Sequence, residues 1–258
     1  MENQEGYSSE VPQEQPQMSE IGTLGNIFLE PGRTFEDLKR KPRFILATII
    51  VSLLVGVYGF ALATKIGEKG VREFIVEQIE KNPQTSSMTG EAKSNMVDMQ
   101  MKFSTIGRYV TPVFVAIFIV IGGLLYWAAG KAFGGTGGFL HGWSVFVYSS
   151  FPPAVVGAIA NFIVLFFKSP NEIDLATSQR TLVHASPAFF IDGKASPVLA
   201  TIIGTLDLFM IWGWVLAAIG LRITNKISSG SAWAIVIIIG LIGVMFRVLG
   251  AFFSGNPT

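Results

Sequence analysis

The chain has 258 residues, of which 50% are hydrophobic and 14% are charged, and its formal net charge is +1. Soluble domains carry about 25% charged residues, so this composition leaves too little polar surface to face water on all sides. The small net charge gives no reason to expect a nucleic-acid partner. The lack of cysteine excludes disulfides, thiolate metal sites and cysteine nucleophiles.

Residues 1–19 are predicted to form a disordered acidic tail. Glutamate recurs there among Pro, Gln and Ser, and such polar segments bury too little apolar surface to fold. No cleavable signal peptide is expected, because the start is acidic and no long apolar run occurs before residue 44. A solvating tail is preferred here over a binding motif.

Residues 20–43 are predicted to be an amphipathic segment that lies on the membrane surface. Ser19 can cap a short helix that Pro31 and Gly32 end, and Thr34 can start a second turn. Apolar side chains beside basic ones suit the headgroup boundary, where each cation contributes about 1 kcal/mol near an anionic leaflet. A pure topology signal would explain the basic residues but not the apolar ones. The predicted membrane-surface anchor consists of Phe28, Phe35, Leu38, Lys39, Arg40, Lys41 and Arg43.

Long apolar runs, each with at most one charged side chain, predict the transmembrane helices of this chain. A run of about 20 residues crosses a hydrocarbon core of about 30 Å. The runs lack the two-residue alternation of barrel strands, so the expected fold is an all-α membrane bundle with five helices. The spans lie at about 44–64, 110–131, 145–167, 198–220 and 232–253. With their loops they form one domain, 44–253, which a short tail at 254–258 follows.

Residues 65–109, between the first two spans, are predicted to form a helical hairpin that continues those spans beyond the bilayer. Pro83 to Thr89 is the expected turn, and Thr89 is a candidate cap for the second arm. An apolar face on each arm is expected to pack against the other, with a surface for a partner or lipid as the alternative. These faces comprise Val71, Phe74, Ile75 and Ile79 on the first arm and Met96, Met99, Phe103 and Ile106 on the second. Residues 168–197 are expected to be an irregular cap.

Basic residues predict that the N-terminus faces the cytoplasm and the C-terminus the outside. Lys and Arg favour the cytoplasmic side of short loops. Here they crowd the start of the first span and recur at Lys131, Arg222 and Lys226, whereas the tail after Ala251 has no charge. With this threading all 5 tryptophans fall in the cytoplasmic half, where their rings favour the membrane interface. The hairpin at 65–109 is then extracytoplasmic.

Four stretches of the chain share their order and spacing with a known family. They are the set Phe28, Pro31, Thr34, Phe35 and Leu38, then "YSSFPP" at 148–153, "LDLFMIWGWVLAAIGLRI" at 206–223 and "SSGSAWA" at 228–234. The chain thereby resembles bacterial Yip1-domain membrane proteins from about residue 20 onward. The resemblance implies five spans, a cytoplasmic N-terminus and a place in the bacterial cytoplasmic (inner) membrane. Eukaryotic members of the family act in vesicle trafficking and contact small GTPases. The motif linked to that role is not evident here, so GTPase binding is not carried over.

Polar residues inside the spans are the candidates for a functional site. Asp207 is expected near the middle of the fourth span, where a charge costs about 2.5–3.5 kcal/mol to insert. Arg247 in the fifth span and Asn161 in the third lie at a similar depth. We predict that Asp207 pairs with Arg247, with Asn161 nearby. This set is either a polar substrate or proton site, or a buried pair that fixes helix register. The family resemblance favours the second, because an Asp before Phe and Trp is usual in this helix.

Pro152 and Pro153 are predicted to kink the third span, because each removes a backbone donor. Tyr148, Ser149 and Ser150 lie one turn earlier. They can either satisfy the freed carbonyl groups or line a cleft that faces the cytoplasm. Close helix packing is the preferred interpretation of the small residues around the kink, and a cavity is the alternative.

The remaining patterns give no support for an enzyme. The glycine-rich stretch "GKAFGGTGGF" at 130–139 lacks the lysine position of a phosphate loop and is predicted to be a flexible hairpin loop. His141 and His184 are predicted on opposite faces of the membrane, so they cannot share a metal. The expected protein is non-enzymatic and without a cofactor. It scaffolds or adapts membrane components, with the lipid bilayer and other membrane proteins as partners. A small permease or lipid-handling protein is the alternative.

The predicted topology can be tested by cysteine labelling, since the chain has no cysteine of its own. A cysteine introduced at Ser254 is expected to react with a membrane-impermeant maleimide added to intact cells. A cysteine at Ser229, in the loop before the last span, is the control and is expected to react only after the membrane is opened. Labelling of position 254 from the cytoplasm alone would reverse the threading.

Overall fold

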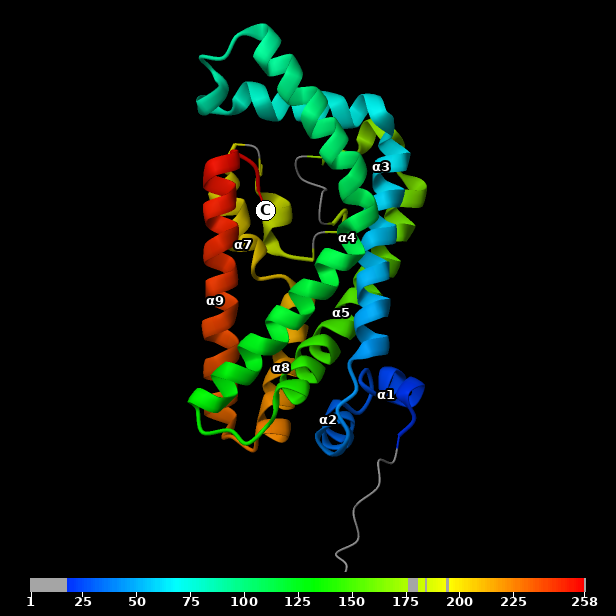
Figure 1. Ribbon diagram of the computed structural model, residues 1–258, viewed down its shortest axis with the longest axis vertical. Coiled ribbons are helices and arrows are strands. Elements are labelled where there is room, and N and C mark those ends of the chain that lie inside the picture. The colour runs from blue at the N-terminus through cyan, green and yellow to red at the C-terminus, as the bar shows by residue number, and fades with distance from the viewer. Residues whose placement is uncertain (1–17, 176–180, 184, 194, 258) are drawn as a thin grey trace, which may run out of the picture.

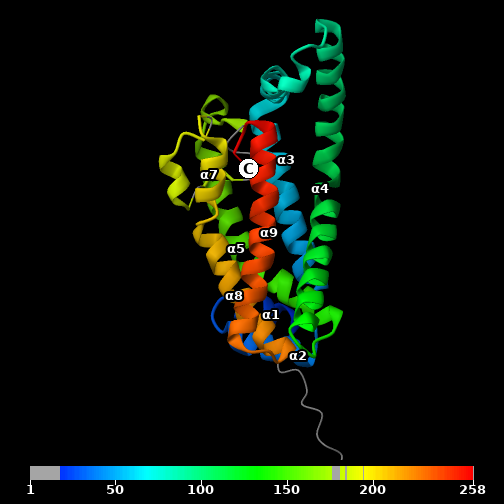
Figure 2. The same cartoon turned by 90° about the vertical axis from the view of Figure 1, so that its left-hand side faces the viewer.

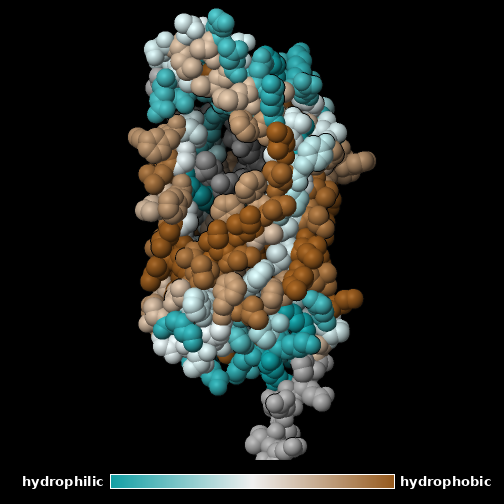
Figure 3. All heavy atoms as spheres, in the orientation of Figure 1, coloured by the Kyte–Doolittle hydropathy of each residue, from teal (hydrophilic) through white to brown (hydrophobic). Residues whose placement is uncertain are grey.

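The computed structural model describes residues 18–175, 181–183, 185–193 and 195–257 (Figure 1). The predicted acidic tail lies outside these residues except for Met18 and Ser19. Helices long and apolar enough to cross a membrane confirm the predicted five-span helical bundle within the described part of the chain. They are α3 (Ile45–Lys81), α4 (Gly90–Ala132), α5 (Phe139–Phe167), α8 (Leu208–Asn225) and α9 (Ser229–Ser254). Apolar side chains form a band across the middle of the molecule, with polar ones at both ends (Figure 3).

The two ends of the described chain lie at opposite ends of the bundle, as an odd number of spans requires (Figures 1 and 2). We call the end that carries α1 (Glu20–Asn26) and α2 (Pro31–Arg40) the N-terminal end. The opposite end, where α3 and α4 are joined, is called the hairpin end. Which of them faces the cytoplasm stays a prediction.

Local sequence explains how α1 and α2 begin. The Ser19 hydroxyl oxygen accepts a hydrogen bond from the Gly22 amide at 3.0 Å, which makes Ser19 the N-cap of α1. Pro31, expected to end this segment, instead begins α2. The first residues of a helix have no helical acceptor for their N–H groups, so proline loses no hydrogen bond there.

The connection between α3 and α4 forms a long helical hairpin. α4 alone has 43 residues, about 65 Å of helix and twice the thickness of a hydrocarbon core. α3 breaks at Gly67, whose φ of 77° favours glycine. The short η1 (Pro83–Thr85) makes the turn, and the Thr89 hydroxyl caps α4 by accepting from the Ala92 amide at 3.3 Å. The arms pack through a buried cluster of Val71, Ile75, Ile79 and Val97.

The second arm does not use most of the apolar face that the sequence suggested. Met99, Phe103 and Ile106 are 51%, 66% and 58% exposed. The prediction that this face packs on the first arm is therefore wrong for these three side chains, although Met96 does join the cluster. Val97, one residue from Met96, is the buried contact instead.

The fourth span is a broken helix, which corrects the predicted continuous helix at 198–220. α7 (Pro197–Gly204) ends, three residues follow, and α8 then begins at Leu208. In the break the Leu208 N–H donates to the carbonyl oxygen of Ala185 at 3.1 Å. Hydropathy averaged over a whole span cannot detect such a break, because the three residues 205–207 lie between two strongly apolar segments. The segment before α7 contains η2 (Pro170–Glu172) and η3 (Pro187–Phe190).

The N-terminal half of the bundle has a closely packed core. Tyr148, Val145, Leu221 and Phe35 are all 0% exposed. They come from α5, α8 and α2, so the short α2 contributes to the same core as the spans. At Gly220 a Cβ atom would lie 2.8 Å from both Phe35 and Val145, so only glycine allows this approach.

The glycine-rich loop between α4 and α5 is a fitted clasp around Asn225, not merely a flexible connection. Asn225, the last residue of α8, is 1% exposed, and its carbonyl oxygen accepts from the Thr136 amide at 3.0 Å. A Cβ atom at Gly130, Gly135 or Gly137 would lie 2.7, 2.9 or 2.5 Å from an atom of the loop or of Asn225. The glycines therefore allow the loop to close on the end of α8.

Gly137→Ala is expected to lower the free energy of unfolding by about 1–3 kcal/mol, because the added methyl group overlaps the Asn225 amide. Reversible unfolding in mixed micelles, followed by circular dichroism, measures the change. Gly243→Ala in α9 is the control, since a Cβ there meets no atom within 4 Å, and it should lose no stability. Equal stability of the two variants would contradict the clasp.

Candidate functional site

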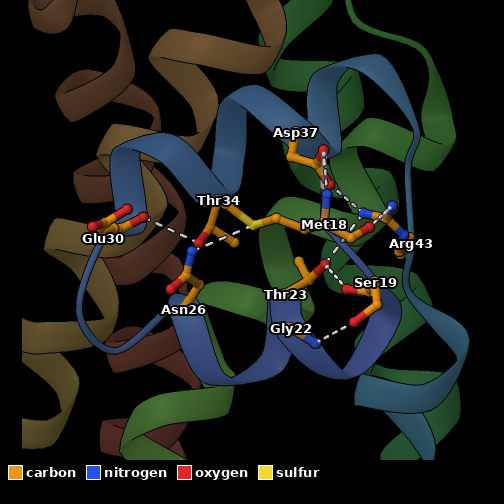
Figure 4. Close-up of polar contacts among 9 residues, drawn as sticks. All are labelled: Met18, Ser19, Gly22, Thr23, Asn26, Glu30, Thr34, Asp37 and Arg43. Atoms are coloured by element: carbon orange, nitrogen blue, oxygen red, sulfur yellow. Dashed lines mark hydrogen bonds and ion pairs between the residues drawn. The ribbon is translucent and has the colours of Figure 1, made fainter. Parts of the chain in front are cut away.

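Part of the predicted membrane anchor forms a buried latch at the N-terminal end (Figure 4). Arg43 donates to the Asp37 carboxylate, to the Thr23 hydroxyl at 3.2 Å and to the Met18 carbonyl oxygen at 2.6 Å. The Asp37 side chain is 3% exposed and that of Arg43 is 10% exposed. Arg43 was expected to anchor this segment at the membrane surface. It instead joins α1, α2 and the start of α3.

The apolar anchor residues also face the protein. Phe35 and Leu38 are 0% exposed, and Phe28 packs edge-on against Phe151 and Trp212, with ring centroids 6.0 and 6.2 Å away. The expectation that these side chains meet the headgroup region is therefore corrected. They close the N-terminal end of the bundle, because burial between helices removes apolar surface from water more completely than contact with headgroups.

The other predicted anchor cations lie on the outside of α2. Lys39 forms an ion pair with Glu36 at 3.4 Å, while Arg40 and Lys41 are exposed. The backbone of Lys39 has a separate role, since its carbonyl oxygen lies 3.0 Å from Nε2 of His141. Nδ1 of His141 accepts from a backbone amide at 3.1 Å, so Nε2 carries the proton and donates. His141 thus ties α2 to the first turn of α5.

The predicted intramembrane polar residues line one cavity of about 690 Å³ in the half of the bundle toward the hairpin end. Asn161 comes from α5, Asp207 from the break before α8, and Arg247 from α9. Figure 3 shows the molecule hollowed on this side, between α9 and the α3–α4 pair. The sequence therefore identified residues that the fold places around a shared space.

Asp207 is the N-cap of α8, so it does not sit within a continuous helix. Its Oδ1 oxygen accepts from the amides of Phe209 and Met210 at 2.8 and 3.3 Å. These amides have no partner within the helix, and in hydrocarbon they would otherwise stay unsatisfied. The carboxylate that was expected to pair with Arg247 is thus held by the backbone of its own helix. Both hydrogen bonds use Oδ1, and the side chain borders the cavity.

Asn161 fastens the segment that covers the cavity. Its Oδ1 accepts from the Leu182 amide at 2.6 Å, the Val183 amide at 3.2 Å and the Thr181 hydroxyl at 3.0 Å. Its Nδ2 donates to the Gly157 carbonyl oxygen at 2.8 Å. All its hydrogen-bonding atoms are therefore occupied, and Asn161 acts as a positioning residue for residues 181–183.

Several lining residues were not identified from the sequence. Tyr58 of α3 and Thr201 of α7 border the cavity, and both are at least nine-tenths buried. On α5 the wall is made of Ala154, Gly157 and Ala158, whose small side chains create the space. The spacing of these three with Asn161 on one helix face was the available signal. For the small residues around the kink, close helix packing was the preferred interpretation and a cavity the alternative.

The proline pair lies where α5 meets α8. Ser149 and Ser150 do not satisfy the carbonyl groups that the prolines free, because both hydroxyls donate to the Phe146 carbonyl oxygen, at 3.0 and 2.8 Å. The carbonyl of Ser149, which loses its partner at Pro153, faces Gly213, where a Cβ atom would lie 3.5 Å away. Tyr148 is fully buried, so the cytoplasm-facing cleft is not found at this residue. Pro153 itself borders the cavity.

Comparison with known proteins places the chain in context. The Yip1 domain family model matches residues 25–250. A protein described as membrane protein YknW, from Bacillus subtilis strain 168, is similar at 26% identity over 239 residues, which is 92% of this chain and 91% of that protein. No solved structure matches the chain significantly. Among the described residues no group of three or more His, Asp or Glu side chains could hold a metal ion.

If Asp207 acts as a helix cap, Asp207→Asn should change the free energy of unfolding by less than about 0.5 kcal/mol, since Asn caps as well as Asp. Asp207→Ala should cost about 1 kcal/mol. A double-mutant cycle of Asp207→Ala with Arg247→Ala, measured by unfolding in mixed micelles, should give a coupling energy below about 0.5 kcal/mol. A larger coupling, with Asn as damaging as Ala, would restore the ion pair as the role of Asp207.

Proposed function

Because the chain belongs to the Yip1 domain family, we propose that it is a non-enzymatic adaptor that receives a membrane partner in the cavity at its hairpin end. It is a multi-pass integral membrane protein of the bacterial inner membrane, and its apolar helices contact the lipid bilayer. The adaptor role is inferred from the position of the cavity relative to the packed core.

The observation that carries the proposal is that the space is confined to one half of the bundle. The cavity borders Asn161, Asp207 and Arg247. Between these residues and the N-terminal end, the bundle is filled by the packed core around Tyr148 and Leu221, both 0% exposed. A permease needs a polar path that can open to both sides, whereas a receptor for a partner needs a space on one side only.

The lining also suits a partner that is largely apolar with a few polar groups. Ala154, Gly157 and Ala158 form a smooth wall on α5, and Phe189 at the rim is 69% exposed. Small residues let a second helix approach closely in lipid. Asp207 and Arg247 provide one acid and one base for orientation. Side chains on one face of a transmembrane segment of another protein meet these requirements, and we propose them as the occupant.

The second candidate function is lipid handling, which the sideways position of the hollow between α9 and the α3–α4 pair favours (Figure 3). A lipid could enter such a space from the bilayer. The two functions differ in what the cavity holds in native membranes. Proton or solute flux through liposomes that contain the purified protein is expected for neither and would support a permease instead.

A photoreactive residue in place of Phe189, at the cavity rim, is expected to crosslink one discrete membrane protein in intact membranes, identified by mass spectrometry. The same residue in place of Phe114, a lipid-facing position of α4 that is 57% exposed, is the control and should give no such product.

Gly157→Leu, which fills open cavity space, should abolish the crosslink. Gly243→Leu, at an open position of α9 outside the cavity lining, should leave it unchanged. Crosslinks to lipid alone from position 189 would favour lipid handling.

A further inference from the structure

A second space lies between α3 and α4, apart from the cavity described above. It is a groove of about 480 Å³. The two helices touch where a Cβ on Gly56 would lie 2.5 Å from the ring of Pro112, and they then separate. At Gly59 and Gly107 a Cβ would meet no atom within 4 Å. Beyond these glycines the hairpin cluster closes the groove again with Val71 and Ile75 as lining residues.

One wall of this groove is polar and the other is apolar. Gln100, Ser104, Arg108 and Thr111 line it from α4, and their spacing of four, four and three residues places them on one helix face. The facing wall on α3 is apolar, with glycines, aliphatic residues such as Leu62 and the aromatic Phe74. Phe103 and Gly107 complete the α4 wall, and the Thr111 hydroxyl donates to the Gly107 carbonyl oxygen at 2.7 Å. Packing against the apolar α3 wall does not account for the other three polar side chains of the stripe.

Arg108 is the charged residue of this stripe, and it has no protein partner among the described residues. Its Nε atom is buried without a hydrogen-bond acceptor, and no described carboxylate forms an ion pair with it. Asp98, which lies earlier in α4, forms an ion pair with Arg72 at 2.8 Å. A guanidinium carries five donors and stays charged, so leaving it partly buried and unpaired is costly. Its surroundings therefore call for an anion.

The position of Arg108 identifies the kind of anion. The residue directly precedes the uncharged run of α4 from 109 to 130. The ring of Tyr109 lies 6.0 Å from that of Phe60, so Arg108 is level with the last turns of the uncharged run of α3. Helix side chains lean toward the helix N-terminus, which here is the hairpin end. The guanidinium thus reaches toward the membrane boundary, where lipid phosphates lie.

We propose that this groove binds a membrane phospholipid through its phosphate group, with Arg108 as the phosphate ligand. Arginine matches phosphate with two parallel hydrogen bonds. Ser104 and Gln100 offer further donors from the same face, and the apolar wall of α3 receives the glycerol end of the acyl chains. The site is independent of the cavity that holds Asp207, so it stands or falls separately from the proposed adaptor function.

Native mass spectrometry of the full-length protein in detergent, titrated with phosphatidylglycerol, tests the proposal. Arg108→Gln is expected to weaken lipid binding about tenfold, which is the size of one lost hydrogen bond to a charged group, and Arg108→Lys should weaken it less. Arg72→Gln, which removes a cation from the same hairpin but outside the groove, should leave binding unchanged. Thermal unfolding of each variant shows whether it is folded.

Two further ligands separate the possible sources of binding. Diacylglycerol with the same acyl chains lacks the phosphate and should bind weakly and without dependence on Arg108. Inorganic phosphate alone should not compete. The proposal fails if diacylglycerol binds as well as phosphatidylglycerol, if Arg72→Gln has the same effect as Arg108→Gln, or if inorganic phosphate displaces the lipid. Should Arg108→Gln not fold, the comparison of the two lipids on the unaltered protein decides, and equal binding of phosphatidylglycerol and diacylglycerol overturns the proposal.

Discussion

The need to satisfy every backbone N–H and C=O group inside hydrocarbon governs this structure. A continuous helix meets that need without help, so each interruption must bring its own partners. At the break before α8, Asp207 accepts from two amides and Ala185 provides an acceptor for Leu208. At the break in α3 the problem is avoided, because Gly67 lies just past the uncharged run, among the charged residues of the hairpin. The break before α8 is the interruption that borders the cavity.

The same constraint divides the bundle into two unlike halves. At the N-terminal end, α2 closes the bundle, and the ion pair of Asp37 and Arg43 fixes the position of α2. Gly220 brings α8 close to Phe35. Toward the hairpin end, the broken fourth span and the small side chains of α5 leave space. A bundle that is closed at one end and open at the other suits reception of a ligand better than its passage.

Composition and periodicity were sufficient to predict five helical spans, and four sequence stretches carried the resemblance to the family that the chain belongs to. They also selected Asp207, Arg247 and Asn161, which do border one cavity. They could not place the break beside Asp207, because hydropathy averaged over a whole span does not show where three residues leave the helix. Nor could they tell that Arg43 and Phe35 face protein. An amphipathic pattern predicts that one face of a helix is buried against an apolar partner. Tertiary contacts decide whether that partner is lipid or protein.

The charged residues of the described chain illustrate how structure separates two roles that sequence leaves merged. Arg43 and Arg108 each directly precede an uncharged run of a spanning helix. Arg43 forms an ion pair with Asp37 and donates to two further acceptors, and these interactions hold α1 and α2 in place. Arg108 has its Nε buried without an acceptor beside an open groove. Since a partly buried cation without a counter-charge destabilises the fold unless something outside the chain supplies one, a ligand belongs at the second arginine and not at the first.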